Sequence, residues 1–147
     1  METLKLTFGN CECKMRVDEN LPQKIYNYFE DRHSNAEYEL FVILKGGFTM
    51  DVEDQEYTLE SGDALIIAPS KYHCSVKTSS DLENLIFPFM LNSSVASSEF
   101  LKKVSPCKKL RLSQLSKMVC ENIVSELENK PSFWQESVKA NYSLLMT

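Results

Sequence analysis

Two histidines and one glutamate are the residues of this 147-residue chain whose types and surroundings suggest chemistry. His33 and His73 are its only histidines, and Glu39 lies in an otherwise apolar, strand-like run. A polar group on an apolar strand face needs a partner, a ligand or a metal, because its desolvation is costly. Imidazole and carboxylate groups together suit Mn, Fe, Zn or Ni. The three residues are therefore candidates for a metal site, for contacts with a small molecule, or for pairing with one another.

Strand-like sequence must bring these residues together, because they lie in two separate stretches, 33–46 and 62–73. Both stretches are rich in β-branched and aromatic residues, with Gly and Pro at their ends. Up to residue 91, short strand patterns recur at about ten-residue spacing with turn signals between them. This pattern predicts a mainly β protein with an antiparallel sandwich or barrel, inside which the two stretches can meet.

The hydrophobic period changes after residue 92, which predicts a helical segment behind the barrel. Residues 92–98 are small and polar and are predicted to form a loop. Ser113 is the predicted N-cap of a helix that ends near Glu128. We expect the apolar face of this helix to pack against the barrel; its residues are Leu115, Met118, Val119, Ile123 and Leu127.

A second helix is predicted after the break at Pro131, and the short joint favours an antiparallel two-helix hairpin. One side of this second helix is apolar. That side offers either a dimer contact or packing within the chain, through Trp134, Val138, Tyr142 and Leu145. The sequence stops at Thr147 on an apolar turn without a helix cap, from which we expect it to continue in a longer protein.

Composition narrows the class of protein. Hydrophobic residues make up 43% and charged residues 25%, as in soluble globular proteins, and the formal net charge of −5 argues against autonomous nucleic-acid binding. No apolar run is long enough to span a bilayer, and residues 1–5 do not resemble a signal peptide. The five cysteines are irregularly spaced, so we expect reduced thiols and a cytoplasmic protein without membrane partners.

The two stretches resemble the two sequence motifs of cupins. The first reads His33-x-Asn35-x3-Glu39-x6-Gly46, and the second runs from Gly62 through Pro69 to His73. Two positions depart from the pattern. An asparagine stands where the first motif has its second histidine, and Lys77 stands where the second motif has its last polar ligand. An amide oxygen is a poor ligand for a transition metal and an ammonium group repels a cation. We therefore predict no bound metal or other cofactor, although a facial triad of the two histidines and the glutamate stays open.

In finer detail the sequence is similar to the N-terminal half of AraC-type transcription regulators. Residues 33–46 and 62–73 match the two characteristic strands of that family, and residues 109–113 with the helices that follow match its next segment. The resemblance implies a cupin-like antiparallel double-stranded β-barrel, or jelly roll, at 1–104. It implies a helical hairpin at 105–147 that dimerises and leads toward an absent DNA-binding domain with two helix-turn-helix units.

The resemblance also implies a function. The chain would be an effector-sensing and dimerisation domain without enzymatic activity, a homodimer that reaches DNA only through the absent domain. Its effector would be a small molecule, with sugars common in the family. The residues expected to contact the effector are His33, Asn35, Glu39, Phe41, His73 and Tyr28. A small metal-dependent cupin enzyme and a standalone small-molecule-binding cupin are the alternatives.

Overall fold

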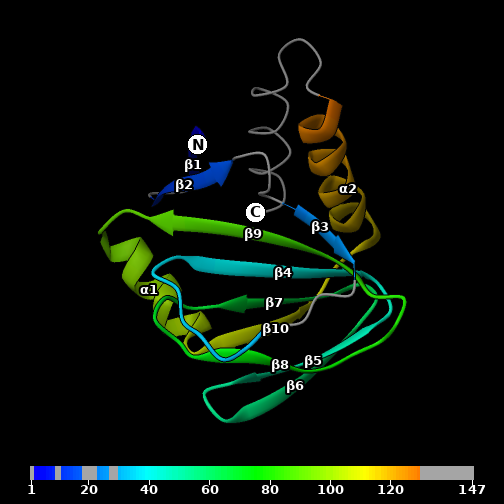
Figure 1. Cartoon of the computed structure of the whole chain (residues 1–147). Coiled ribbons are helices and arrows are strands. Elements are labelled where there is room, and N and C mark those ends of the chain that lie inside the picture. The colour runs from blue at the N-terminus through cyan, green and yellow to red at the C-terminus, as the bar shows by residue number, and fades with distance from the viewer. Residues whose placement is uncertain (1, 9–10, 18–22, 27–29, 130–147) are drawn as a thin grey trace.

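The computed structural model of the chain describes residues 2–8, 11–17, 23–26 and 30–129 (Figure 1). Its strands are β1 (Glu2–Phe8), β2 (Cys11–Val17), β3 (Gln23–Tyr26), β4 (Tyr38–Lys45), β5 (Gly47–Val52), β6 (Gln55–Glu60), β7 (Asp63–Ile67), β8 (His73–Thr78), β9 (Glu83–Leu91) and β10 (Cys107–Arg111). Its helices are α1 (Val95–Val104) and α2 (Gln114–Asn129). No helix among the described residues is long and apolar enough to cross a membrane.

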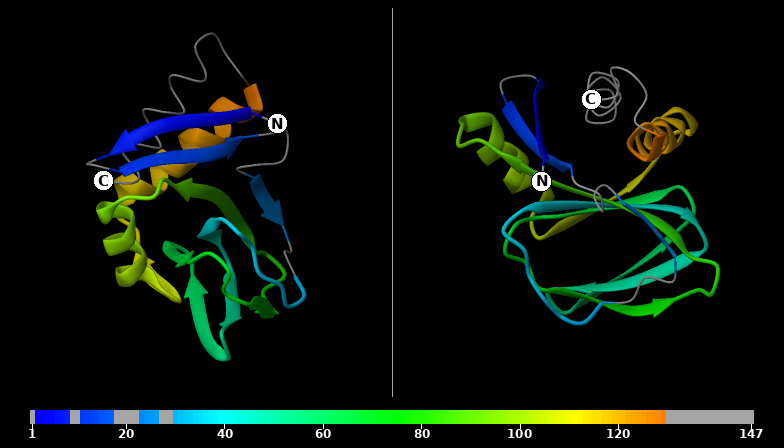
Figure 2. Two further views of the ribbon diagram at one scale, coloured as in Figure 1. Left: turned by 90° about the vertical axis from the view of Figure 1, so that its left-hand side faces the viewer. Right: turned by 45° about the horizontal axis from the view of Figure 1, so that its top comes forward.

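Two antiparallel sheets face each other and form the barrel (Figure 2). The larger sheet has seven strands in the order β1-β2-β9-β4-β7-β10, with β3 pairing beside β2 on β9. The smaller sheet has the order β6-β5-β8. The strand sequence and the facing sheets confirm the predicted mainly β jelly roll.

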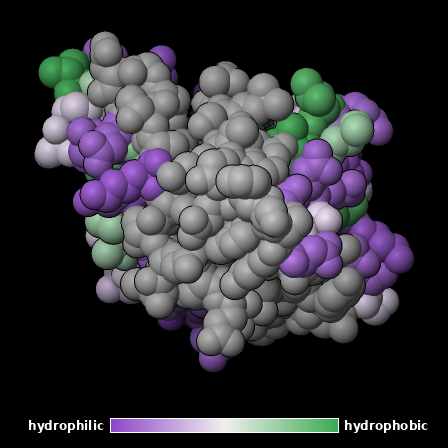
Figure 3. Space-filling view, turned by 90° about the horizontal axis from the view of Figure 1, so that it is seen from above, coloured by the Kyte–Doolittle hydropathy of each residue, from purple (hydrophilic) through white to green (hydrophobic). Residues whose placement is uncertain are grey.

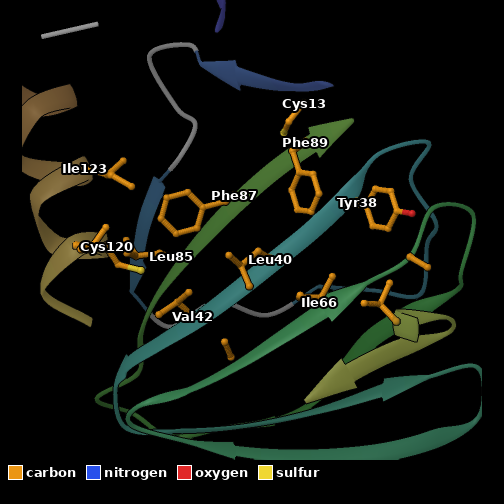
Figure 4. Packing of buried hydrophobic residues seen from close by; sticks show 14 residues of the cluster. Cys13, Tyr38, Leu40, Val42, Ile66, Leu85, Phe87, Phe89, Cys120 and Ile123 are labelled. Atoms are coloured by element: carbon orange, nitrogen blue, oxygen red, sulfur yellow. The ribbon is translucent and has the colours of Figure 1, made fainter. Parts of the chain in front are cut away.

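The larger sheet is covered on both faces by hydrophobic residues, which form two separate cores. The inner core fills the space between the sheets and includes Phe41, Phe48 and Leu65. The outer core lies between the larger sheet and the helices, and Figure 4 shows Leu40 and Phe87 of the sheet on the same side as Ile123 of α2. Because both faces of β4 are covered, nearly all of its residues are buried and its sequence is an almost unbroken apolar run.

The alternation predicted for β4 is confirmed by this division. Phe41 and Ile43 belong to the inner core, whereas Tyr38, Leu40 and Val42 belong to the outer core. Glu39 has the same parity as Phe41 and therefore points toward the inner face of the sheet. A strand buried on both faces thus carries one carboxylate, at the end where the chain enters the barrel.

A glycine fixes the tight connection between β4 and β5. Gly46 has a φ of +84°, in the left-handed region that glycine adopts without strain. A Cβ at this position would also collide with the side chains of Ser79 and Asp81. Gly47, the next residue, has a negative φ and open space around the position of a Cβ. The two adjacent glycines therefore serve different purposes, and only the first is required by the turn.

The loop predicted at 92–98 is wrong, because a helix begins inside it. Ser94 caps α1: its Oγ accepts a hydrogen bond from the Ser97 N–H, and the Ser97 Oγ accepts one from the Ser94 N–H. This reciprocal arrangement is a capping box made with a serine in place of the usual Glu or Gln. The buried Val104 and the half-buried Phe100 anchor the helix on the outer core.

Helix α2 begins as predicted, one residue after Ser113, whose Oγ accepts a hydrogen bond from the Ser116 N–H at 3.1 Å. Its predicted apolar face is only partly correct. Val119 and Ile123 are buried in the outer core, but Leu115 and Met118 are 60% and 53% exposed. Seen from above, the surface is hydrophobic on the flank where α2 lies (Figure 3). The predicted second helix and its dimer residues Trp134, Val138, Tyr142 and Leu145 lie outside the described residues.

Strand β10 attaches the helical segment to the barrel through a buried carboxylate. It lies within the segment 105–147 that the sequence assigned to helices, yet it pairs with β7 along its whole length. Asp63 accepts hydrogen bonds from the Glu60 N–H at 2.9 Å and from Arg111 Nη1 at 3.0 Å. Burial opposes the ionisation of Asp63, but these hydrogen bonds and the nearby Lys109 hold its pKa below the usual value. The Gly-Asp pair of the second motif is therefore structural.

Candidate functional site

A pair of backbone hydrogen bonds places the two histidines side by side at the end of the barrel. The His33 N–H donates to the His73 carbonyl at 3.0 Å, and the His73 N–H donates to the His33 carbonyl at 2.9 Å. Two further hydrogen bonds continue this pairing between Glu30 and Ser75, each 2.9 Å long. Residues 30–33 therefore run antiparallel to β8, although the sequence separates them from it by about forty residues.

Both imidazoles have the same orientation relative to their own backbone. Nδ1 of His33 lies 2.8 Å from the Asp31 carbonyl, and Nδ1 of His73 lies 2.9 Å from the Lys71 carbonyl. Because a carbonyl can only accept, each Nδ1 carries the proton. The lone pair of each neutral ring is therefore on Nε2, where it can accept a proton or bind a cation.

Each Nε2 faces a carboxylate. Nε2 of His33 lies 2.9 Å from Oε1 of Glu30, and Nε2 of His73 lies 3.3 Å from Oε1 of Glu39. The second contact is close enough for electrostatic attraction, but its atoms are not aligned for a hydrogen bond, so the buried His73 Nε2 has no hydrogen-bond partner. The ring centroids of the two histidines are 4.3 Å apart, with their planes at 61°.

Asn35 holds the central carboxylate in place. Its Nδ2 donates a hydrogen bond to Oε1 of Glu39, the same oxygen that faces His73. The sequence predicts that Asn35 contacts an effector; the structure shows instead what one of its N–H groups does within the chain. It orients Glu39 and partly neutralises the charge of a carboxylate that is only 7% exposed.

The electrostatics of the site follow from burial and from its opposite charges. Burial disfavours the charged form of His73, but the adjacent Glu39, the Lys71 carbonyl and Glu30 together raise the pKa of His73 above its ordinary value. Burial raises the pKa of Glu30, and Glu39 adds to this effect, while His33 and His73 oppose it. The site therefore attracts positive charge, whether a proton or a cation supplies it.

The residues available are those of a cation site. His33, Glu39 and His73 each offer one donor atom, and these atoms lie within 4.8 Å of one another. A transition metal with bonds of about 2.0–2.2 Å spaces its donors by up to about 4.4 Å, so closure by a few tenths of an ångström suffices. Two neutral imidazoles with a carboxylate form a facial set suited to Fe, Mn, Zn or Ni. The donor chemistry fits a metal, and the unpartnered His73 Nε2 is the buried atom that such an ion would satisfy.

The other predicted site residues take different places. Phe41 has no exposed surface; its ring centroid lies 6.2 Å from that of His73 and 6.4 Å from that of Phe48, so it supports the site from within the core. Lys77, which stands at a motif position for a ligand, is exposed on β8. Tyr28 lies outside the described residues.

A second buried polar side chain lies deeper in the barrel. Asn84 on β9 is fully buried, and neither its Nδ2 nor its Oδ1 has a hydrogen-bond partner. It is paired with Ile43 of β4, and strand alternation places it on the inner face, level with Leu82 and Ile86. The sequence offered one signal for it, a carboxamide within the most hydrophobic strand.

Glu30 is the site residue that sequence reasoning missed. It precedes the first motif by three residues, in a stretch that the sequence described only as aromatic and extended. The pairing of residues 30–33 with β8 brings its carboxylate to His33. Only the long-range partner of this segment, which local sequence does not specify, distinguishes Glu30 from other exposed acidic residues.

Comparison with known proteins agrees with this geometry. Residues 28–86 match the family model described as "Cupin domain". No curated protein matches the chain. Among solved structures, ToxT from Vibrio cholerae is similar over 97% of this chain at 10% identity, with a TM-score of 0.56. KdgF from Halomonas sp. is similar over 53% of this chain and 67% of its own length, at 16% identity and a TM-score of 0.37.

The similarity to ToxT covers 52% of the ToxT chain, so the present chain spans about half of that protein's length. At such low identity the similarity concerns the fold alone, but it extends beyond the barrel into the helical segment. The matched motifs, the two facing sheets and the clustered histidines all lie within or beside residues 28–86. These observations together identify residues 28–86 as a cupin domain within a chain of cupin fold.

Proposed function

We propose that the chain is the effector-sensing and dimerisation domain of an AraC-type transcription regulator, which controls a separate C-terminal helix-turn-helix domain. In this role it has no enzymatic activity. The order of its parts carries the proposal: two motif stretches, the edge strand β10 and the Ser113-capped helix α2 follow one another as in that family. The cupin fold and its similarity to ToxT through the helical segment are consistent with this order.

The site supplies the contacts that a polar effector needs. Glu39 and the buried Nε2 of His73 are an acceptor and a group that can either accept or, once protonated, donate a hydrogen bond. His33 is partly exposed and lies at the entrance beside them. A hydroxyl-rich or cationic small molecule can replace the contacts that these groups now make with one another.

The same strand offers a route from the effector to the helices. Glu39 lies on the inner face of β4, and its neighbours Leu40 and Val42 lie in the outer core with Val119 and Ile123 of α2. A shift of β4 at the site therefore moves the surface on which α2 packs. An effector controls the helices only if it binds the two arrangements with different affinity.

Light scattering and thermal unfolding of the 147-residue chain test this proposal. We expect a homodimer, and we expect one member of a panel of monosaccharides or other small polar molecules to raise the melting temperature. Glu39→Gln should remove this stabilisation, because it neutralises a central contact, whereas Glu56→Gln on the exposed β6 should retain it. A monodisperse monomer at high concentration would count decisively against the proposal.

A metal-dependent cupin enzyme is the second candidate, and the donor atoms of His33, Glu39 and His73 within 4.8 Å favour it. A bound ion would supply Lewis-acid or oxygen chemistry at these residues. Asn35 would keep Glu39 oriented toward it. Elemental analysis of purified protein and unfolding with and without a chelator test this candidate. Stoichiometric metal with chelator-sensitive stability is expected; a metal-free protein that the chelator leaves unchanged would eliminate it.

A further inference from the structure

The carboxylate of Glu30 lies beside the candidate site but belongs to neither sequence motif. Its Oε1 is 2.9 Å from Nε2 of His33, the atom that carries the lone pair of that ring. The backbone of Glu30 is fixed by two hydrogen bonds with Ser75, a residue of β8 that is only 7% exposed. Glu30 is thus attached to the same strand as His73, and its position does not depend on its own exposed side chain.

The four groups form two matched pairs around one point. Glu30 faces Nε2 of His33, Glu39 faces Nε2 of His73, and the two rings are in contact. Both rings carry their proton on Nδ1, against a backbone carbonyl, which leaves both Nε2 lone pairs directed at the carboxylates. Lone pairs directed at anions repel one another unless a cation lies between them. Two carboxylates with two neutral imidazoles carry a charge of −2, which a divalent ion neutralises.

We propose that Glu30 completes, with His33, Glu39 and His73, a four-donor site for a divalent transition-metal ion. The inference rests on the ligand site of the proposed function and names the chemical class of its ligand. Imidazole and carboxylate donors select Zn, Mn, Fe or Ni over the harder Mg and Ca. Asn35 cannot fill the fourth position, because its amide is already engaged with Glu39.

A simple ion pair between Glu30 and a protonated His33 is the competing explanation for the 2.9 Å contact. Both side chains are partly exposed, and such pairs contribute little to stability. The two explanations differ in what Glu30 affects. An ion pair would affect the unfolding of the metal-free protein slightly and metal binding not at all, whereas a fourth donor would affect metal binding alone.

Isothermal titration of the chelator-treated 147-residue chain with ZnCl2, MnCl2 and NiCl2 tests the proposal. The wild type should bind one ion per chain. Glu30→Gln should weaken binding of the preferred ion by about 10–100-fold, the range found when groups supporting a metal site are removed. Glu30→Asp, which keeps the charge on a shorter side chain, should recover part of the affinity. Glu56→Gln, at an exposed position of β6, should bind as the wild type does.

Melting temperatures of the same proteins provide the second readout. Without metal, Glu30→Gln should melt within about 1–2 °C of the wild type, since an exposed substitution changes stability by at most a few tenths of a kcal/mol. With the preferred ion, the wild type should gain stability that Glu30→Gln loses. Equal affinity of wild type and Glu30→Gln would overturn the role of Glu30. A wild type that binds none of the three ions would overturn the metal site, while the dimer measurement would still decide the regulator proposal.

Discussion

The two histidines at the barrel entrance are held by the same local device, in which Nδ1 donates to the carbonyl two residues earlier. This arrangement decides the chemistry of both rings, because it places the lone pair on Nε2. Sequence identified the residues His33, Glu39 and His73 correctly as a cluster, since both motifs end in them. It could not identify the tautomers or the carboxylate partners, because these depend on backbone carbonyls and on a pairing between distant segments.

Asn84 is the residue at which the fold bears an unrelieved energetic cost. A buried carboxamide without partners loses its hydrogen bonds to water, which costs about 1–3 kcal/mol. Asn84→Leu keeps the branched shape and removes both polar atoms. We expect it to raise the free energy of unfolding by about 1 kcal/mol or more, as measured by urea denaturation. Asn122→Leu, at an exposed position of α2, should change that free energy by less than about 0.5 kcal/mol.

Asp63 should make stability depend on pH. Its folded-state pKa is depressed, so its contribution is fully present above the unfolded pKa, near 4, and is lost as the pH falls through the folded value. Asp63→Asn should therefore lower the free energy of unfolding at pH 7, by about 1–3 kcal/mol for a buried charged hydrogen-bond network. The difference from the wild type should shrink below about pH 4. A difference that is constant from pH 7 to pH 3 would contradict this assignment.

Asp54→Asn is the matched control for that experiment. Asp54 is 86% exposed and pairs with Arg32 at the surface, at 3.3 Å. An exposed pair of this kind contributes about 0–1 kcal/mol. The control should therefore show a flat and small difference from the wild type over the same range of pH.

At the scale of the elements, the β4–β5 connection separates the need for glycine from its mere presence. Gly46→Ala should destabilise the protein by more than about 1 kcal/mol, because alanine must adopt a φ of +84° and its Cβ meets Ser79 and Asp81. Gly47→Ala should be close to neutral, since its φ is negative and its surroundings are open. Thermal unfolding of the two variants makes the comparison, and equal losses would contradict the account of the turn.

The barrel strands were predictable because their apolar patterns and turns are local. The errors lie where long-range packing decides. Helix α1 was assigned to a loop, because a capping box of two serines resembles loop sequence. The α2 face was drawn too wide, because the sheet covers Val119 and Ile123 but does not reach Leu115. The role of Glu30 depends on pairing with β8, which no local pattern specifies.

At the scale of the whole molecule, the exposed apolar residues of α2 bear on assembly. If the chain dimerises through its helices, the double substitution Leu115→Lys with Met118→Lys should weaken the dimer by about tenfold or more, because it places two charges on the exposed apolar side. Light scattering over a series of concentrations measures this change. Val95→Lys, at a residue 77% exposed on α1, is the matched control and should leave the dimer intact. Equal effects of the two substitutions would argue against α2 as the contact.

The net charge of −5 conceals an uneven distribution. Residues 102–117 carry six Lys or Arg residues and no carboxylate, and half of these cations lie on β10. Among the described strands, β10 is the last of the larger sheet. Lysines on such an edge oppose pairing with the edge of another molecule. The chain can therefore expose this strand without extending its sheet into a second copy.

The backbone bridge between His33 and His73 also makes the site readable by hydrogen exchange. Its two amide protons can exchange with solvent only when residues 30–33 separate from β8, and that separation pulls the two imidazoles apart. Anything that binds both rings must therefore slow exchange at these amides, by the same factor by which it stabilises the closed arrangement. Amides of the β5–β6 hairpin, which the site does not touch, provide the internal reference. Occupancy of the site would then appear as a lengthened lifetime of two backbone protons, without knowledge of what the occupant is.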